Sequence, residues 1–223
     1  MLKRRFLSLS IQTACALTAC AGLVAFCYWH IDRPVALWVR DHVGVAVNWL
    51  RWPDIITVII IAAPIWLVWA GITQMRRPWR RHETLFVAIA ISVVGMIILK
   101  QILKFTFGRP STPLWIENGG SLEDRDFAFR WFHGFPPYDS FPSGHMAITC
   151  TLASLAWFFL PKWRWLAAAS VAIVAVCLII TNDHFVGDII AGGFIGWVGG
   201  AWSVQLMPRS ILPTDTQMKC RKG

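Results

Sequence analysis

Charged residues are scarce in this sequence of 223 residues: they make up 15% of it, whereas hydrophobic residues make up 56%. Soluble domains of this size carry about a quarter charged residues, so the apolar side chains here exceed what a water-facing globule buries. This shortage of charge argues against a soluble protein. It predicts an integral membrane protein in contact with the lipid bilayer.

Cysteine is present but not clustered. The six cysteines lie apart from one another, and none forms a CxxC pair or a metal-type group. They are Cys15, Cys20, Cys27, Cys150, Cys177 and Cys220. The spacing argues against a disulfide framework and against a zinc site, and it indicates small apolar packing residues.

A nucleic-acid-binding module is also missing, although the net charge is +9. The lysines and arginines form short clusters between apolar stretches, as at Arg76, Arg77, Arg80 and Arg81. Such clusters are typical of the cytoplasmic loops of membrane proteins. They predict that both termini lie in the cytoplasm, and they argue against a nucleic-acid partner.

Six apolar stretches are candidates to cross a membrane. They cover residues 6–28, 55–74, 84–107, 143–160, 166–181 and 188–206. The predicted fold class is an all-α bundle of six transmembrane helices in one domain, residues 1–208, followed by a basic cytoplasmic tail, residues 209–223. The first stretch also resembles a lipoprotein signal ending at Cys20, but its hydrophobicity continues to Tyr28, which favours an uncleaved helix.

Two further segments lie outside these stretches. Residues 34–52 have an apolar face rich in tryptophan and a polar face, which favours a helix at the periplasmic membrane interface over a plain loop. Residues 108–140 form the longest polar segment and predict an ordered extramembrane loop with a short helix. In the last apolar stretch, Gly192, Gly196 and Gly200 recur every fourth residue and predict close packing against another helix.

The run Phe141-Pro142-Ser143-Gly144-His145 opens the fourth apolar stretch. Proline suits the first turn of a helix, and glycine lets a ligand approach the backbone closely. Free N–H groups at the positive end of a helix attract anions. This turn therefore predicts a phosphate-binding site.

A second motif, His184 and Asp188, follows one apolar stretch later. The i,i+4 spacing places imidazole and carboxylate on one helix face, where the carboxylate can hold one ring nitrogen protonated and leave the other free to react. Lys104 and Arg109 lie upstream and carry the positive charge that a phosphoryl group requires. The predicted topology brings these residues and His145 together near the outer face of the membrane.

These residues resemble the phosphatidic acid phosphatase type 2 superfamily, membrane lipid phosphatases that share a helical core with vanadium haloperoxidases. The PSGH signature of that family matches residues 142–145, and its third signature, a histidine and an aspartate four residues apart, matches His184 and Asp188. Its first signature, which begins with lysine and ends in Arg-Pro, is matched by residues 104–110.

The resemblance implies a mechanism in which His184 attacks phosphorus to give a phosphohistidine and Asp188 orients it. His145 would protonate the leaving oxygen and later activate water. The residues implied to bind phosphate are Lys104, Arg109, Ser143, through its hydroxyl and N–H, and Gly144, through its N–H. No metal or other cofactor is expected, because lysine, arginine and a helix N-terminus already supply the positive field.

Two departures from the family pattern concern arginines. The first signature usually has its arginine seven residues after the lysine, where this chain has Ser111, and Arg109 comes two residues earlier. The Ser-Arg that usually precedes the third-signature histidine is replaced by Cys177 and Leu178. The pattern is similar to a bacterial branch that lacks this arginine. Arg125 and Arg130 of the long loop are candidate substitutes.

The resulting hypothesis is a lipid phosphatase of the bacterial cytoplasmic (inner) membrane, with its active site facing the periplasm or cell exterior. Candidate substrates are phosphatidic acid, phosphatidylglycerol phosphate, undecaprenyl pyrophosphate and lipid A phosphate. Two alternatives stay open. One is a lipid phosphotransferase, in which a lipid or sugar hydroxyl replaces water, and the other is a non-catalytic membrane protein that binds an anion or a lipid.

Overall fold

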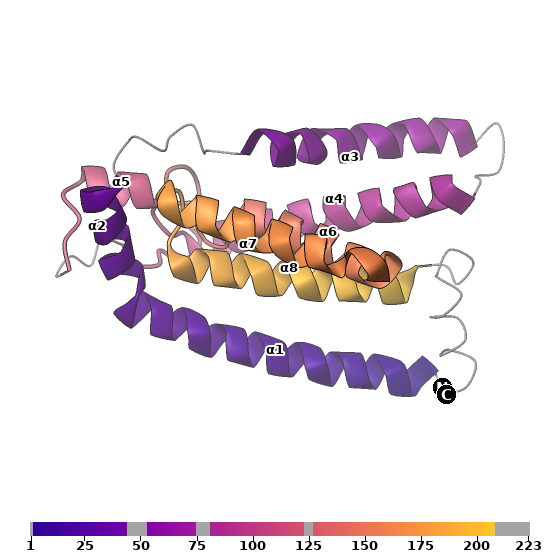
Figure 1. Ribbon diagram of the computed structural model, residues 1–223, viewed down its shortest axis with the longest axis horizontal. Helices are drawn as coiled ribbons and strands as arrows, with labels where there is room; N and C mark the ends of the chain where they lie inside the picture. Colours follow the sequence, from indigo (N-terminus) through magenta and orange to yellow (C-terminus); the bar gives the residue numbers. More distant parts are fainter. Residues whose placement is uncertain (1, 44–52, 75–80, 123–126, 208–223) are drawn as a thin grey trace.

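The computed structural model describes residues 2–43, 53–74, 81–122 and 127–207. Helices form nearly all the regular structure in these ranges (Figure 1). In chain order they are α1 (Leu2–His30), α2 (Asp32–His42), α3 (Pro53–Gln74), α4 (Arg81–Phe107), α5 (Thr112–Glu117), α6 (Gly144–Phe159), the 3-10 turn η2 (Pro161–Trp163), α7 (Arg164–Ile180) and α8 (Val186–Leu206). No strand occurs within the described ranges, so the predicted all-α class is confirmed there.

The apolar helices have the lengths and surfaces of membrane segments. Four helical segments are long and apolar enough to cross a bilayer, and two are shorter. The long ones are Leu7–His30, Glu83–Phe107, Pro161–Ile180 and Val186–Leu206, and the shorter ones are Val58–Thr73 and Gly144–Phe159. Outward-facing side chains such as Ile65, Val68, Ile98 and Ile173 are more than half exposed. Such surfaces are stable against lipid rather than water, so the chain is a multi-pass membrane protein.

Each of the six predicted apolar stretches corresponds to one helix. The stretches fall in α1, α3, α4, α6, α7 and α8. Because α3 and α6 contain only shorter apolar segments, six complete crossings stay a prediction. The predicted tail, residues 209–223, and the arginine cluster at residues 76–80 lie outside the described residues.

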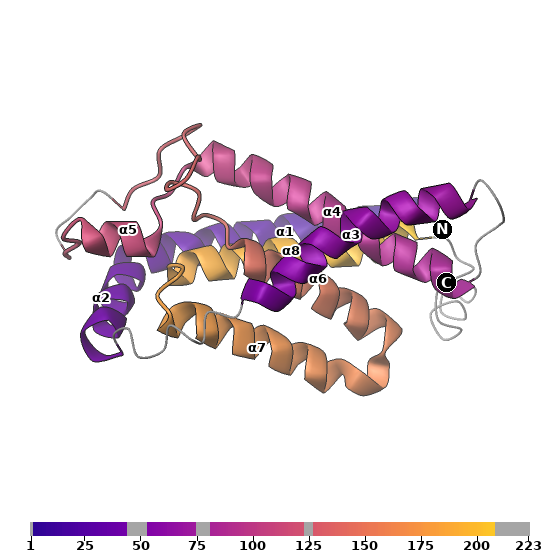
Figure 2. The same cartoon turned by 90° about the horizontal axis from the view of Figure 1, so that it is seen from above.

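The apolar helices run along the length of the molecule, and α2 and α5 lie together at one end of it (Figures 1 and 2). The beginning of α1 and the end of α8 lie at the opposite end. The start of α8 is at the same end as α2 and α5 (Figure 1), and the start of α6 lies against it, because the Ser143 N–H donates to the Asp188 carbonyl. The motif residues at the starts of α6 and α8 therefore lie at this end of the molecule.

The predicted interfacial helix, residues 34–52, corresponds in part to α2. The helix begins at Asp32 and ends at His42, and residues 44–52 lie outside the described part of the chain. Its buried side chains, Asp32, Ala36 and Val39, face the rest of the protein. Its place at a membrane interface stays a prediction.

The long polar segment is ordered where the structure describes it, and α5 confirms its predicted short helix. Its later part pairs with the chain that leaves α4. The Ser111 N–H donates to the Pro137 carbonyl at 2.9 Å, and the Ser140 N–H donates to the Arg109 carbonyl at 3.0 Å. An isolated parallel bridge also pairs Arg109 with Asp139. These contacts place Arg109 and Ser140 side by side.

Helices α6 and α8 pack closely because α8 presents glycines to α6. A Cβ atom at Gly192 would collide with the Ser143 carbonyl, and one at Gly196 would collide with the Ala147 carbonyl. A Cβ at Gly200 would lie 2.6 Å from the Ser154 Cβ, which is closer than van der Waals contact allows. The predicted glycine face is confirmed, and it fixes the start of α8 against the start of α6.

We expect Gly196→Ala to lower the melting temperature in detergent, because the added methyl group forces α8 away from the α6 backbone. Overpacking of this kind costs about 1–3 kcal/mol of unfolding free energy. Gly22→Ala is the matched control, because a Cβ at Gly22 of α1 meets no atom within 4 Å. An equal melting temperature for Gly196→Ala and Gly22→Ala would contradict the packing described here.

Candidate active site

The phosphate-binding turn predicted from the sequence forms the start of α6. Ser143 is its N-cap and accepts the Met146 N–H on its hydroxyl oxygen at 3.4 Å. Gly144 and His145 occupy the first turn, where N–H groups have no acceptor within the helix. The positive end of the α6 dipole therefore lies at Gly144 and His145.

The Ser143 N–H, which the sequence predicts to bind phosphate, has another acceptor in the structure. It donates to the Asp188 carbonyl at 3.0 Å, so this group is not available to a phosphate oxygen in the structure. The bond instead ties the α6 start to the first turn of α8. The Ser143 side chain is fully buried, and its hydroxyl hydrogen is the group left to donate. The predicted roles of this hydroxyl and of the Gly144 N–H stay predictions.

His184, Ser140 and Asp188 form a hydrogen-bonded group. The Ser140 hydroxyl donates to Asp188 Oδ2 at 2.7 Å and lies 3.1 Å from His184 Nδ1. Asp188 Oδ2 is 3.7 Å from the same ring nitrogen. Since the Ser140 hydrogen points to the carboxylate, its oxygen accepts from Nδ1–H, which leaves Nε2 as the nitrogen free to react. The predicted i,i+4 pairing is present, with Ser140 as a bridge.

Arg109 forms two buried ion pairs. Its NH1 donates to Asp188 Oδ1 at 2.6 Å and its NH2 to Asp32 Oδ2 at 2.7 Å, and all three side chains are fully buried. The guanidinium also lies over the Phe185 ring, 4.2 Å from the ring centroid. Three further rings, of Tyr28, Phe127 and Phe129, surround it at 5.2–5.6 Å. In the structure both terminal nitrogens of Arg109 donate to carboxylates, and its predicted contact with phosphate stays a prediction.

Burial and charge act in opposite directions on this ion group. Burial disfavours a charged guanidinium, but the Asp188 and Asp32 carboxylates outweigh it and raise the pKa of Arg109, so Arg109 stays cationic. For Asp32, burial raises the pKa above its ordinary value, although the Arg109 guanidinium lowers it. Buried charges are retained only when paired in this manner.

Two lysines of α4 point toward the same end. Lys104 Nζ lies 3.4 Å from Asp139 Oδ2. Lys100 lies one helical turn earlier, and a Cβ added at Gly144 would be 3.0 Å from its Nζ, so this ammonium group lies against the α6 start. Among the residues that the structure describes, Lys100 forms no ion pair with a carboxylate. Both lysines act electrostatically on His145, as does His184.

Of the two candidate substitutes for the missing arginine, the structure describes Arg130. The Arg130 guanidinium stacks over the Tyr138 ring, 4.5 Å from its centroid. Arg125 lies outside the described residues. Lys100, whose ammonium group lies against the α6 start, is another candidate for the role of the missing arginine.

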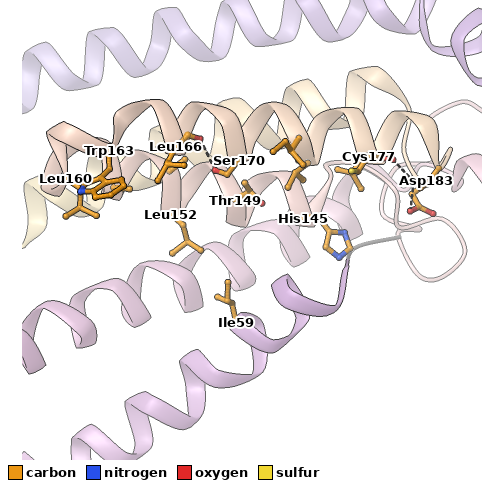
Figure 3. Close-up of a pocket in the computed structure, with 17 residues that line it drawn as sticks. Ile59, His145, Thr149, Leu152, Leu160, Trp163, Leu166, Ser170, Cys177 and Asp183 are labelled. Atoms are coloured by element: carbon orange, nitrogen blue, oxygen red, sulfur yellow. Dashed lines mark hydrogen bonds between the residues drawn. The ribbon is translucent and has the colours of Figure 1, made fainter. Parts of the chain in front are cut away.

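A cavity of about 660 Å³ leads away from His145 along α6 and α7 (Figure 3). His145 and Asp183 lie at one end, and Leu160 and Trp163 lie at the other. The wall between them is largely apolar, with residues such as Leu152 and Ile59. This shape suits a ligand with a polar head at His145 and a hydrocarbon chain along the helices.

Ser140 and Asp32 were not found from the sequence. Ser140 lies three residues before Ser143, outside any signature, and only its nearness to the PSGH run marks it. Asp32 lies far from every motif, and no sequence signal indicated it. Within the described ranges, no group of three or more His, Cys, Asp or Glu side chains is placed to hold a metal ion.

Ser140→Ala is expected to lower kcat about tenfold, because one hydrogen bond between His184 and the Asp188 carboxylate is lost. Such a bond contributes about 1–1.5 kcal/mol. The measurement is the initial rate of phosphate release at saturating substrate. Ser203→Ala is the control, since the Ser203 hydroxyl bonds only to the Gly199 carbonyl within α8. An unchanged kcat in Ser140→Ala would contradict the bridge.

The sequence profile of the PAP2 superfamily matches residues 84–212, which include most of α4 and all of α6, α7 and α8. An undecaprenyl-diphosphatase from Sulfolobus acidocaldarius is 26% identical over 156 residues, which cover 68% of this chain and 69% of that protein. No solved structure matches.

Proposed function

Because the chain belongs to the PAP2 superfamily, we propose that it hydrolyses a phosphate monoester or pyrophosphate carried by a membrane lipid. The observation that carries the proposal is the meeting of three features at one end of the bundle. His184 is held by Ser140 and Asp188, His145 opens α6, and an apolar cavity begins at His145. A reactive imidazole beside a lipid-sized apolar cavity suits a lipid phosphate.

In the proposed reaction, His184 Nε2 attacks phosphorus, and the bond from phosphorus to the leaving oxygen breaks. His145 donates a proton to that oxygen, and a phosphohistidine results. Water then attacks phosphorus, His145 accepts the proton, and the bond between nitrogen and phosphorus breaks to release phosphate. Asp188 stabilises the positive charge that the His184 ring carries while it is phosphorylated.

Positive charge at the site stabilises the phosphoryl oxygens in the transition state. The groups that supply it are Lys100, Lys104 and the N–H groups at the α6 start, and they make a metal ion unnecessary. Lys100 takes the place of the arginine missing from the third signature. Arg109 acts indirectly, through Asp188.

The cavity argues for a lipid substrate over a water-soluble one. It extends from His145 to Trp163 near the end of the helix pair, and a 16-residue helix such as α6 is about 24 Å long. A hydrocarbon chain of a membrane lipid fits along that length. Undecaprenyl pyrophosphate, the substrate class named by the Sulfolobus acidocaldarius relative, is one of four candidates, with phosphatidic acid, phosphatidylglycerol phosphate and lipid A phosphate.

We further propose that the protein lies in the cytoplasmic membrane of a bacterium, with the α2 and α5 end facing outward. The basic clusters of the sequence support this orientation, because lysine and arginine are retained on the cytoplasmic side. The beginning of α1 and the end of α8 would then both face the cytoplasm.

The test is phosphate release by the purified protein in detergent from each of the four lipids, with and without EDTA. A water-soluble phosphate monoester is the control for the apolar cavity. Release from a lipid that persists in EDTA, with slower release from the soluble ester, is the expected result. Release that EDTA abolishes would overturn the metal-free mechanism. A phosphorylated acceptor lipid or sugar without free phosphate would instead identify a phosphotransferase.

A further inference from the structure

Asp32 belongs to α2, outside the segment that the family profile covers, yet its side chain is fully buried beside the site. Its Oδ2 accepts from Arg109 NH2 at 2.7 Å, and its Oδ1 accepts the Gly187 N–H at 2.8 Å. A carboxylate taken out of water is costly unless its oxygens are paired. Both oxygens of Asp32 are paired, and both partners contact or adjoin Asp188.

Arg109 links Asp32 to the reacting histidine in a short series of contacts. Arg109 NH1 donates to Asp188 Oδ1 at 2.6 Å, and the other Asp188 oxygen receives the Ser140 hydroxyl at 2.7 Å. Ser140 then contacts His184 Nδ1 at 3.1 Å. The second contact of Asp32, at Gly187, holds the first turn of α8, on which Asp188 lies.

The charges of this group do not cancel. One guanidinium lies between two carboxylates, so the group retains a net negative charge when both carboxylates are ionised. If Asp32 were neutral, Arg109 would compensate Asp188 alone. Charges interact strongly in a buried site. Because Asp32 compensates part of the positive charge of Arg109, part of the negative charge of Asp188 stays uncompensated and acts on Ser140 and His184.

We propose that Asp32 is a positioning residue of the active site, which holds Arg109 and the α8 start so that Asp188 keeps its negative charge directed at His184. The inference rests on the proposed phosphohistidine chemistry. The His184 ring becomes cationic when Nε2 bonds to phosphorus and Nδ1 keeps its proton. The negative group stabilises that cation, which is present in the intermediate and not in free enzyme.

The main variant is Asp32→Asn, which keeps the size of the side chain and removes its charge. It leaves Arg109 and Asp188 as a neutral buried pair, so the charge balance permits folding. We expect kcat to fall about 10²-fold with KM changed less than about twofold, because substrate does not contact Asp32. An unchanged kcat in Asp32→Asn would overturn the proposal.

Asp41→Asn is the matched control. Asp41 lies on the same helix, is solvent-exposed, and pairs with Arg40 at 2.7 Å away from the site. It is expected to keep the kcat and melting temperature of the unmodified protein. Equal losses of kcat in Asp41→Asn and Asp32→Asn would indicate a general effect of α2 and would overturn the specific role of Asp32.

A second variant reaches the same contact from α8. A Cβ at Gly187 would lie 3.1 Å from Asp32 Oδ2, so Gly187→Ala pushes the carboxylate away from its partners. Alanine favours a helix more than glycine does, so the substitution does not weaken α8. It also leaves every residue of α2 unchanged. A several-fold fall in kcat at unchanged KM is expected. If Asp32→Asn does not fold, an unchanged kcat in Gly187→Ala overturns the proposal.

A spectroscopic measurement separates this proposal from the proposed function. In protein labelled with ¹⁵N-histidine, the Nδ1 resonance of His184 is identified by its loss in His184→Ala. It is expected to shift in Asp32→Asn and not in Asp41→Asn. If the unmodified protein releases phosphate from no lipid, the proposed function fails, and this shift still decides whether Asp32 acts on His184. An unshifted resonance overturns the role of Asp32 even where phosphate release is confirmed.

Discussion

His184→Ala is expected to lower phosphate release by at least about 10³-fold, because the proposed mechanism has no other nucleophile. The imidazole is held through Nδ1 by Ser140 and Asp188, and its side chain is 11% exposed. Alanine removes the atom that bonds to phosphorus. It leaves the buried group of Asp32, Arg109 and Asp188 in place, so the fold is expected to persist.

The matched control for this prediction is His133→Ala. His133 is exposed in the long loop, where its Nδ1 contacts the Trp131 carbonyl. Its replacement is expected to leave the rate unchanged. A lipid labelled with ³²P provides a direct second measurement: quenching in alkali should leave label on the unmodified protein and none on His184→Ala. Residual release of one tenth or more in His184→Ala would contradict the nucleophile assignment.

Lys100→Met is expected to lower kcat about 10²-fold, the effect of removing one group that stabilises charge in a transition state. The reason is the different surroundings of the two lysines of α4. Lys104 is partly neutralised by Asp139 at 3.4 Å, whereas Lys100 lies against the α6 start beside Gly144. Methionine keeps the length and apolar stem of lysine, so the loss reports the ammonium charge.

Lys162→Met is the control for this substitution, because Lys162 is exposed in the turn η2, beside Trp163 at the opposite end of the cavity. It should retain the full rate. Lys100→Arg should recover part of the lost activity, since it restores a cation with a longer side chain. Full activity in Lys100→Met would show that Lys100 only reaches toward the membrane surface, and another residue would then fill the place of the missing arginine.

The helices and the two histidines could be predicted from the sequence because both follow from local patterns. Long apolar runs have few structures open to them in a bilayer, and the glycines of α8 recur at helical spacing. The PSGH run and the pair His184 and Asp188 each lie within a few residues. These motifs can therefore be recognised without knowing which distant parts of the chain come together.

The role of Arg109 could not be predicted in this manner. Its position before Pro110 suggests a phosphate ligand, but its surroundings depend on Asp32, on Asp188 and on four aromatic rings from three segments of the chain. Local spacing says nothing about which carboxylate approaches a guanidinium. Ser140 was missed for a similar reason, since its contact with His184 arises only when the loop pairs with the end of α4.

The contact between Asp32 and Gly187 also has a consequence for where this protein can be divided. The family profile begins at residue 84, but one of the two carboxylates paired with Arg109 comes from α2, which precedes that boundary. A shortened chain beginning at residue 84 would leave the guanidinium with one carboxylate and would free the Gly187 N–H. With the role proposed for Asp32, the unit needed for catalysis includes α2 as well as the family segment.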